Sequence, residues 1–266
     1  MVRRYIQNFI KYIPLLCCLT SRDFKLKYRR SILGVVWSML NPLLIMVVVT
    51  SVFSVILKVD SSDMPFSVFY ITGSLIFNFF AEATTSSMTA VISNSSLIQK
   101  VYVPKYIFVF EKCAFSFLNM VLSSIAVICV MIFYIFTGEV KIHLTILLII
   151  IPMMFTFLFS VGIGLMLSTL TVFFRDMVHI WGVIITIWLY LTPVIYPIKM
   201  LYASNIDWIV RLNPVYYFVD DLRQFMVLGR FPGIDHFVFE GFSCGFVLLF
   251  GVIIFKKAQD KFILHI

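Results

Sequence analysis

Long apolar runs, separated by short basic segments, constrain this sequence more than any other feature. The run from Ile32 to Leu57 contains no charged residue, and about 20 apolar residues in a helix are enough to cross the hydrocarbon of a bilayer. The chain is 61% hydrophobic and only 13% charged, whereas soluble domains average about 25% charged residues. We therefore predict an all-α integral membrane protein.

Six segments are predicted to span the membrane, in one transmembrane domain (32–266) that follows a cytoplasmic segment (1–31). They cover residues 32–57, 65–92, 106–136, 142–173, 177–197 and 237–255. The last of them is short and carries Glu240 near its start. Its Gly241 and Gly245 form a GxxxG step, a spacing that permits close helix packing but is common by chance.

Lys and Arg are unevenly distributed among the segments that connect these spans. Most of the 21 lie before the first span, after the second and fourth spans, and at the end of the chain. Because cytoplasmic segments of membrane proteins carry an excess of Lys and Arg, both termini are predicted to be cytoplasmic. The net charge of +8 is then a topology signal, and nucleic acid is not a predicted partner.

The cytoplasmic segment ends in a strongly basic stretch. On a helix, Phe24, Tyr28 and Ile32 share one apolar stripe. The cations gather on the adjoining face: Arg22, Lys25 and Arg29. This pattern is typical of a helix that lies in the membrane interface with its cations toward anionic lipid or an acidic partner. A plain positively charged anchor for the first span explains the same residues.

The segment between the fifth and sixth spans, residues 198–240, is too long for a simple turn. It mixes apolar stretches, such as Leu212 to Val219, with charged residues. Two short helices that re-enter the membrane from outside and a surface loop both fit this pattern. Re-entrance requires that protein or a water-filled cavity surround the irregular backbone.

The chain lacks a recognisable source of energy. None of its eleven glycines is followed by Lys, so it has no phosphate-binding loop of the G-x-x-x-x-G-K type. Its cysteines and histidines show no metal-binding spacing, and the acidic pair Asp220-Asp221 is interpreted as part of a solvated outer loop. We predict no catalytic, cofactor or metal site. Glu82, a carboxyl within a span, leaves a proton-coupled carrier as an alternative.

Four stretches, taken in order, resemble one known family. They are RDFKLKYRRSILGVVWSMLNP, STLTVFFRDMVHI, LTPVIYP and LNPVYYFVDDLRQFMVLG. Together they are similar to the membrane subunit of type-2 ATP-binding-cassette exporters of cell-surface polysaccharides, which carry O-antigen, capsule or teichoic acid. The resemblance extends from about Ser21 to Lys261.

The resemblance implies a homodimer in the bacterial cytoplasmic membrane, with two copies of a separate ATPase subunit that use ATP and Mg²⁺. The substrate of this exporter would be a lipid-linked polysaccharide, and the permease would also contact membrane lipid. By resemblance, seven residues would contact or couple to the ATPase: Arg22, Lys25, Arg29, Lys100, Lys105, Arg175 and Asp176. The alternative interpretation is an exporter of the same architecture that carries a drug or a lipid instead of a polysaccharide.

The resemblance also favours re-entrance of residues 198–230 as a gate segment on the outer side. Its candidate gate residues are Asn213, Pro214, Tyr216, Tyr217 and Arg223. The channel would run along the first and fifth spans, where aromatic rings suit the C–H faces of sugars. The candidates to line it are Trp37, Phe80, Glu82, Trp188, Tyr190 and Tyr196.

Overall fold

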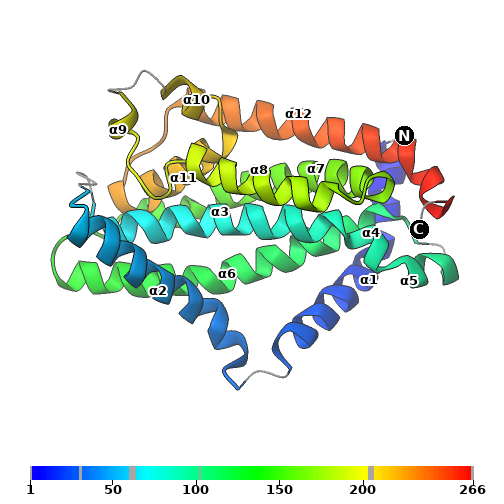
Figure 1. Cartoon of the computed structure of the whole chain (residues 1–266), viewed down its shortest axis with the longest axis horizontal. Helices are drawn as coiled ribbons and strands as arrows, with labels where there is room; N and C mark the ends of the chain where they lie inside the picture. Colours follow the sequence, from blue (N-terminus) through cyan, green and yellow to red (C-terminus); the bar gives the residue numbers. More distant parts are fainter. Residues whose placement is uncertain (1, 30–31, 60–63, 102, 203–206, 265–266) are drawn as a thin grey trace.

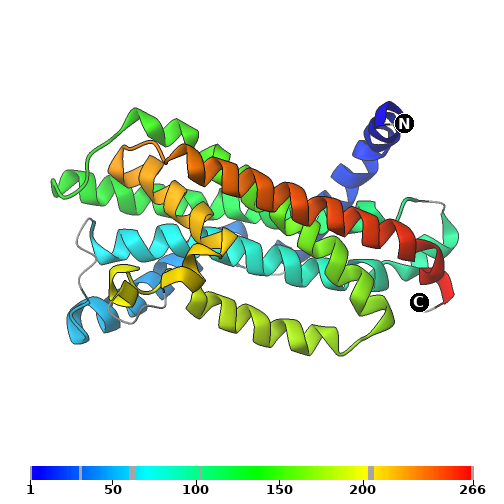
Figure 2. The same cartoon turned by 90° about the horizontal axis from the view of Figure 1, so that it is seen from above.

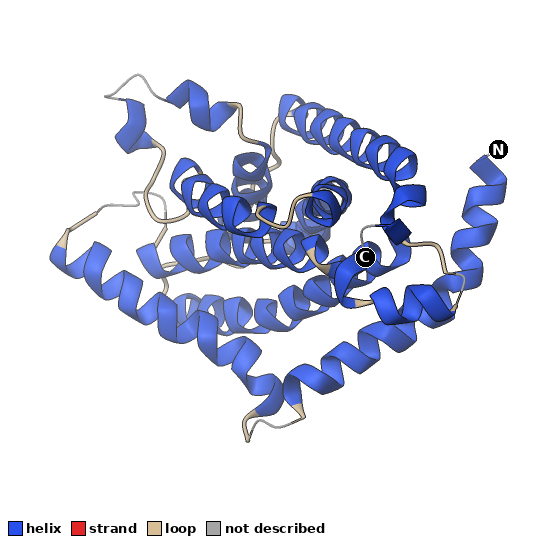
Figure 3. Ribbon diagram, turned by 45° about the vertical axis from the view of Figure 1, so that its right-hand side comes forward, coloured by secondary structure: helices blue, strands red, loops and turns tan. Residues whose placement is uncertain are grey.

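A computed structural model of the chain describes residues 2–29, 32–59, 64–101, 103–202 and 207–264. Within these ranges the chain is helical, with no strand (Figure 3). Five long helices lie roughly side by side and form the body of the molecule (Figure 1, Figure 2). They are α3 (Phe66–Met88), α6 (Tyr106–Phe136), α7 (Ile150–Phe173), α8 (Met177–Leu191) and α12 (Ile234–Ala258).

The remaining elements lie before, between and after these helices. α1 (Val2–Tyr28) and α2 (Trp37–Thr50) form a V against one side of the body (Figure 1). The short elements are η1 (Gly34–Val36), η2 (Ser51–Ile56), α4 (Ala90–Ser93), α5 (Ser95–Lys100), η3 (Leu144–Ile149), α9 (Lys199–Tyr202), α10 (Asp207–Arg211), α11 (Pro214–Arg223), η4 (Gln224–Leu228) and η5 (Gln259–Leu264).

Five helical segments in the described part of the chain are long and apolar enough to cross a membrane. They are Gly34–Ile56, Phe66–Met88, Tyr106–Phe136, Leu144–Phe173 and Ile234–Phe262. These correspond to predicted spans one, two, three, four and six. α8, which corresponds to the predicted fifth span, is apolar but shorter. The described ranges are thus all-α, as predicted, with five candidate membrane-spanning helices.

Helix ends differ from the prediction at three places. α8 ends at Leu191 rather than near residue 197, because Pro193 disfavours helical backbone at Thr192, which is extended (φ −104°, ψ 126°). α12 begins at Ile234 rather than at residue 237. α1 is one helix from Val2, so the basic stretch is the end of a long helix rather than a separate short one.

α3 lies at the centre of the molecule. It packs against α2, α6, α7, α8 and α11, and most of its side chains are buried. On its far side from α2, α7 packs closely on α12, where an added Cβ at Gly251 would lie 2.4 Å from the carbonyl oxygen of Gly162. Small residues allow membrane helices to approach in this way. Gly241 and Gly245, by contrast, face open space.

The two ends of the helical body differ. At one end lie α5, the turn between α7 and α8, and the C-terminus; we call this the α5 end (Figure 1, Figure 2). At the other lie α9, α10 and α11, which we call the α11 end. Each end holds its own set of polar contacts.

Candidate functional site

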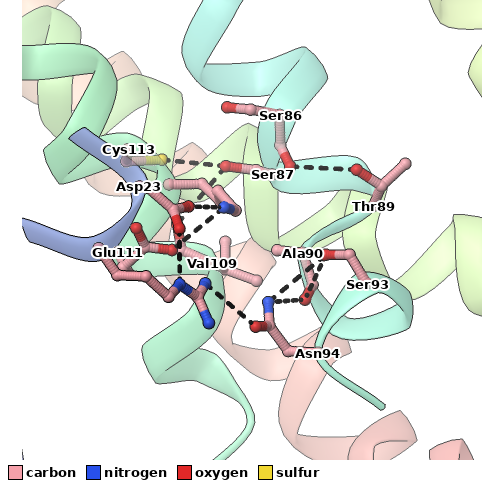
Figure 4. Close-up of polar contacts among 12 residues, drawn as sticks. Asp23, Ser86, Ser87, Thr89, Ala90, Ser93, Asn94, Val109, Glu111 and Cys113 are labelled. Carbon is pink, nitrogen blue, oxygen red and sulfur yellow. Dashed lines mark hydrogen bonds and ion pairs between the residues drawn. The ribbon is translucent and has the colours of Figure 1, made fainter. Parts of the chain in front are cut away.

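A polar cluster at the α5 end joins α1 to α6 and to the α4–α5 turn (Figure 4). The carboxylate of Asp23 accepts a hydrogen bond from Arg22 Nε at 2.8 Å and forms an ion pair with Lys112 on α6. Burial favours the neutral carboxyl, but the hydrogen bonds and charges of Lys112 and Arg22 outweigh it and lower the pKa of Asp23. Asp23 therefore anchors the end of α1 to α6.

The same cluster reaches the α4–α5 turn. Arg22 Nη2 lies 3.5 Å from Asn94 Oδ1, and Asn94 Nδ2 donates to the carbonyl of Ala90 at 2.8 Å. Glu111 is completely buried and lies 3.5 Å from the Lys112 ammonium. One continuous set of polar contacts thus links three segments at this end of the molecule (Figure 4).

Six of the seven predicted coupling residues are exposed. They are Arg22, Lys25, Arg29, Lys100, Arg175 and Asp176. Lys105 differs, because its ammonium donates to the carbonyl of Gln259 and lies 5.5 Å from the centre of the Phe262 ring. Burial lowers the pKa of Lys105, and the nearby Asp260 opposes this shift. Lys105 therefore ties the start of α6 to η5 within the chain.

A cavity of about 500 Å³ lies between α2, α3 and α6, with the last turn of α1 at one side. Trp37 and Asn41 of α2, Asn78 and Glu82 of α3, and Asn119 of α6 line it. Lys27 Nζ and Asn119 Nδ2 each lie 3.0 Å from Glu82 Oε1. The cavity can hold a polar molecule inside an otherwise apolar region.

The predicted channel-lining residues fall into different surroundings. Trp37 and Tyr190 are 46% and 63% exposed, and Glu82 borders the cavity. Tyr196 is half-buried and donates to the carbonyl of Tyr190. Phe80, however, is completely buried. It packs in the core of the chain against Phe159, Trp181 and Trp188, so it presents no surface to a channel.

At the α11 end, Asn213 joins α8 to α11. Its side-chain oxygen accepts from Val215 N at 3.0 Å, which caps α11, and from Trp188 Nε1 at 2.8 Å. Its amide nitrogen donates to Thr192 Oγ1 at 2.8 Å. Pro214 occupies the first turn of α11, where its missing N–H costs nothing. The predicted gate residues Asn213 and Pro214 and the predicted channel residue Trp188 thus belong to one junction.

Arg223 fastens the other end of α11. Its guanidinium is buried and donates to the carbonyls of Pro193 and Phe69, both at 2.9 Å. Gly73 makes room for it, since an added Cβ there would lie 2.5 Å from Arg223 Nη2. The side chain of Arg223 thus links α11 both to α3 and to the end of α8.

The acidic pair on α11 is not a solvated loop, contrary to the sequence-based interpretation. Asp221 is completely buried and lies 2.8 Å from His236 Nδ1 on α12. The Tyr217 ring packs on His236 with centroids 4.8 Å apart, and Tyr216 packs on Tyr217. Asp220, Asp221 and His236 have ligand atoms within 4.8 Å of one another, which is close enough to hold a metal ion. Asp221 thus joins α11 to α12.

The profile of the ABC-2 type transporter family matches residues 14–227 of the chain. This match covers well over half of its length. The chain belongs to the ABC-2 type transporter family. ABC-2 membrane subunits are permeases without an ATPase site, which agrees with the absence of a phosphate-binding loop from the sequence.

Individual relatives of this ABC-2 permease are O-antigen exporters. An O-antigen export system permease protein RfbA from Klebsiella pneumoniae is 30% identical over 251 residues, 93% of each chain. A second protein of that name and organism is 27% identical over 253 residues and 93% of each chain. The RfbA of Myxococcus xanthus is 26% identical over 231 residues, 86% of each chain.

Sequence reasoning missed several polar residues of the permease that the fold brings together. Asn78 precedes Glu82 by one helical turn, and Asn119 precedes Ser123 in the same way. This spacing inside apolar helices could have indicated a polar stripe. No sequence signal, by contrast, relates Asp23 to Lys112, which lie 89 positions apart.

Proposed function

We propose that this ABC-2 permease is the channel-forming subunit of an ATP-driven exporter that moves a lipid-linked polysaccharide outward across the bacterial cytoplasmic membrane. The cargo would be of the O-antigen, capsule or teichoic-acid type. The observation that carries the proposal is 30% identity to an O-antigen export permease across 93% of both chains. The four sequence stretches of the polysaccharide exporters support the same cargo.

ATP would be hydrolysed in a separate ATPase subunit, one for each permease of a homodimer. We infer that the ATPase contacts the exposed charged residues Arg22, Lys25, Arg29, Lys100, Arg175 and Asp176. The contacts of Arg22 and Asp23 support this inference, because they join α1 to α6 and the α4–α5 turn. A push on one of these segments is thereby passed to the others.

The α5 end, with both termini, would face the cytoplasm, in keeping with the excess of Lys and Arg. In this arrangement α8, extended by Thr192 to Pro197, would be the fifth of six spans. α11 would be the re-entrant gate helix. Its burial against α3, α7 and α12 supports this role, because short helices at membrane depth need surrounding protein.

The second permease subunit would complete the channel. No residue of α2 is completely buried within one subunit, and α8 buries only Trp181. These two helices supply Trp37 and Tyr190 as exposed aromatic rings. A long glycan moves only if each contact with the channel is weak and the contacts are many, as in ion conduction.

The test is deletion of the gene in the native cells, with complementation, and assay of glycan on both sides of the membrane. Export predicts that surface glycan is lost and that lipid-linked glycan accumulates in the cytoplasmic leaflet. Complementation should reverse both changes. If surface and cytoplasmic glycan remain unchanged, with no second exporter expressed, the polysaccharide assignment is wrong and a drug or lipid becomes the expected cargo.

A further inference from the structure

The cavity between α2, α3 and α6 is lined by polar groups at membrane depth. Each helix contributes a stripe with helical spacing: Trp37 and Asn41 on α2, Asn78 and Glu82 on α3, and Asn119 and Ser123 on α6. α2 leans away from the body toward the end of α1 (Figure 1), and the last turn of α1 also borders the cavity. The volume of the cavity, about 500 Å³, lies within the range of about 300–1,000 Å³ that is typical of sites for small molecules.

Two amides in this cavity have no partner in the described part of the chain. The side chains of Asn41 and Asn78 are both exposed, and neither makes a hydrogen bond within the described ranges. Both lie within membrane-crossing segments. Amides are costly to leave unpaired in hydrocarbon, so the presence of two such amides indicates that a polar ligand or water occupies the cavity.

The charges of the cavity favour a neutral ligand. The Lys27 ammonium and the Glu82 carboxylate are paired at 3.0 Å, so their charges cancel. An anionic phosphate headgroup would have to separate this pair or face the carboxylate. Hydroxyl groups, in contrast, can both donate to the carboxylate and amide oxygens and accept from the amide nitrogens of Asn41 and Asn78.

Trp37 adds a flat apolar surface to these hydrogen-bonding groups. Its indole is 46% exposed and borders the cavity. An aromatic face beside carboxylate and amide groups suits a sugar ring, which has an apolar C–H face and a rim of hydroxyls. A phospholipid tail could pack on the Trp37 ring, but it would leave the amides of Asn41 and Asn78 without hydrogen-bond partners.

We propose that this cavity is a saccharide subsite within a single subunit, which binds a neutral sugar unit of the exported glycan. Glu82, Asn78 and Asn41 contact its hydroxyls, and Trp37 packs on its ring. The subsite rests on the proposed function, since it names where that substrate is held. It is independent of the aromatic rings of α8.

The test places a photo-crosslinking amino acid at Asn78 of the full-length permease in its native cells. Val48 on α2, which is 63% exposed and outside the cavity, receives the same amino acid as the matched control. After irradiation, the purified protein is stained for carbohydrate and its mass is measured. The proposal predicts a glycan adduct at Asn78 at least about ten times as abundant as at Val48.

A phospholipid adduct alone at Asn78, or equal glycan adducts at both positions, would overturn the subsite. If the Asn78 variant does not accumulate in the membrane, the crosslinker at Asn41 decides the question by the same criterion. Surface glycan is measured in the same cells. If export continues and no glycan adduct forms in the cavity, only the subsite proposal is wrong. If surface glycan is unchanged in the deletion strain, the proposed function itself is wrong.

Discussion

The guanidinium carbon of Arg223 lies 3.6 Å from the centre of the Phe69 ring, while its Nη2 donates to the carbonyl oxygen of the same residue. Cation–π contact and hydrogen bond thus join α11 to the first turns of α3. The second hydrogen bond, to Pro193, reaches the end of α8. Three segments that are distant in the sequence meet at this side chain.

Replacing Arg223 should loosen α11. Arg223→Met leaves the carbonyls of Pro193 and Phe69 without this donor, at a cost of about 1–3 kcal/mol for each buried group. We expect a thermal unfolding midpoint several degrees lower in detergent, together with reduced export. Arg223→Lys should recover only part of the loss, since an ammonium cannot reproduce the planar fork.

The exposed Arg230 provides the control for this substitution. Arg230→Met should change the free energy of unfolding by no more than about 0.5 kcal/mol, as is usual for surface substitutions, and should leave the midpoint almost unchanged. Equal destabilisation by the two Met variants would show that Arg223 has no special part in holding α11.

Gly73→Ala tests the space that Arg223 occupies. The new methyl group would lie 2.5 Å from Arg223 Nη2, and the guanidinium cannot move without breaking its hydrogen bonds. We expect a loss of about 1–3 kcal/mol, as for other overpacked sites. Gly182→Ala, on α8, meets nothing within 4 Å and should be neutral or slightly stabilising, because Ala favours helix. Unfolding of both variants in the same detergent decides between these outcomes.

The contact of α7 with α12 depends on Gly251 rather than on the GxxxG step. Gly251→Ala would place a methyl group 2.4 Å from the carbonyl oxygen of Gly162, so the helices must separate. We expect a loss of about 1–3 kcal/mol or more. Gly245→Ala, on the same helix, faces open space and is the matched control. A destabilised Gly245 variant beside an unaffected Gly251 variant would contradict the observed packing.

The anchor between Asp23 and Lys112 should weaken in acid. The pKa of Asp23 in the folded protein is below its ordinary value of 3.8. A carboxyl with a lowered folded-state pKa contributes stability above its unfolded-state pKa, and this contribution is lost as the pH falls through the folded-state value. Its contribution is therefore complete at pH 7 and is lost progressively as the pH falls below about 4.

Asp23→Asn should accordingly destabilise the permease at pH 7, by about 1–2 kcal/mol for a partly solvated charged hydrogen bond. Thermal unfolding at pH 7 and near pH 3 measures the difference in stability between the variant and the parent protein. This difference should be smaller at the acid pH. Glu82→Gln removes a more exposed ion pair, worth about 0–1 kcal/mol. A difference for Asp23→Asn that stays constant with pH would contradict the charged anchor.

Much of the fold followed from local sequence patterns. The span predicted at 106–136 coincides with α6, because the uncharged apolar run after Lys112, residues 113–136, is by itself long enough to cross a bilayer. α8 was predicted too long, since the apolar run continues past Leu191 although Pro193 ends the helix. Hydropathy counts apolar residues and is insensitive to such breaks in the backbone.

The candidate sites were harder to predict, because they depend on contacts between distant segments. Phe80 appeared suited to a channel as an aromatic residue in a span, yet it lies in the core beside Phe159 and Trp181. Asp221 appeared to be solvated, yet His236 covers it from α12. Periodicity assigns a residue to a face of its helix but does not determine which helix lies opposite.

Inverted membrane vesicles provide the most direct measurement of ATP-driven export. Vesicles from cells that contain the permease, its ATPase and lipid-linked glycan are given ATP, and the glycan protected from an added glycosidase is measured over time. The account predicts that ATP makes the glycan progressively resistant to the enzyme, and that vesicles from the deletion strain show no such change. Glycan that stays fully digestible with ATP, in vesicles that contain the intact complex, would contradict the account.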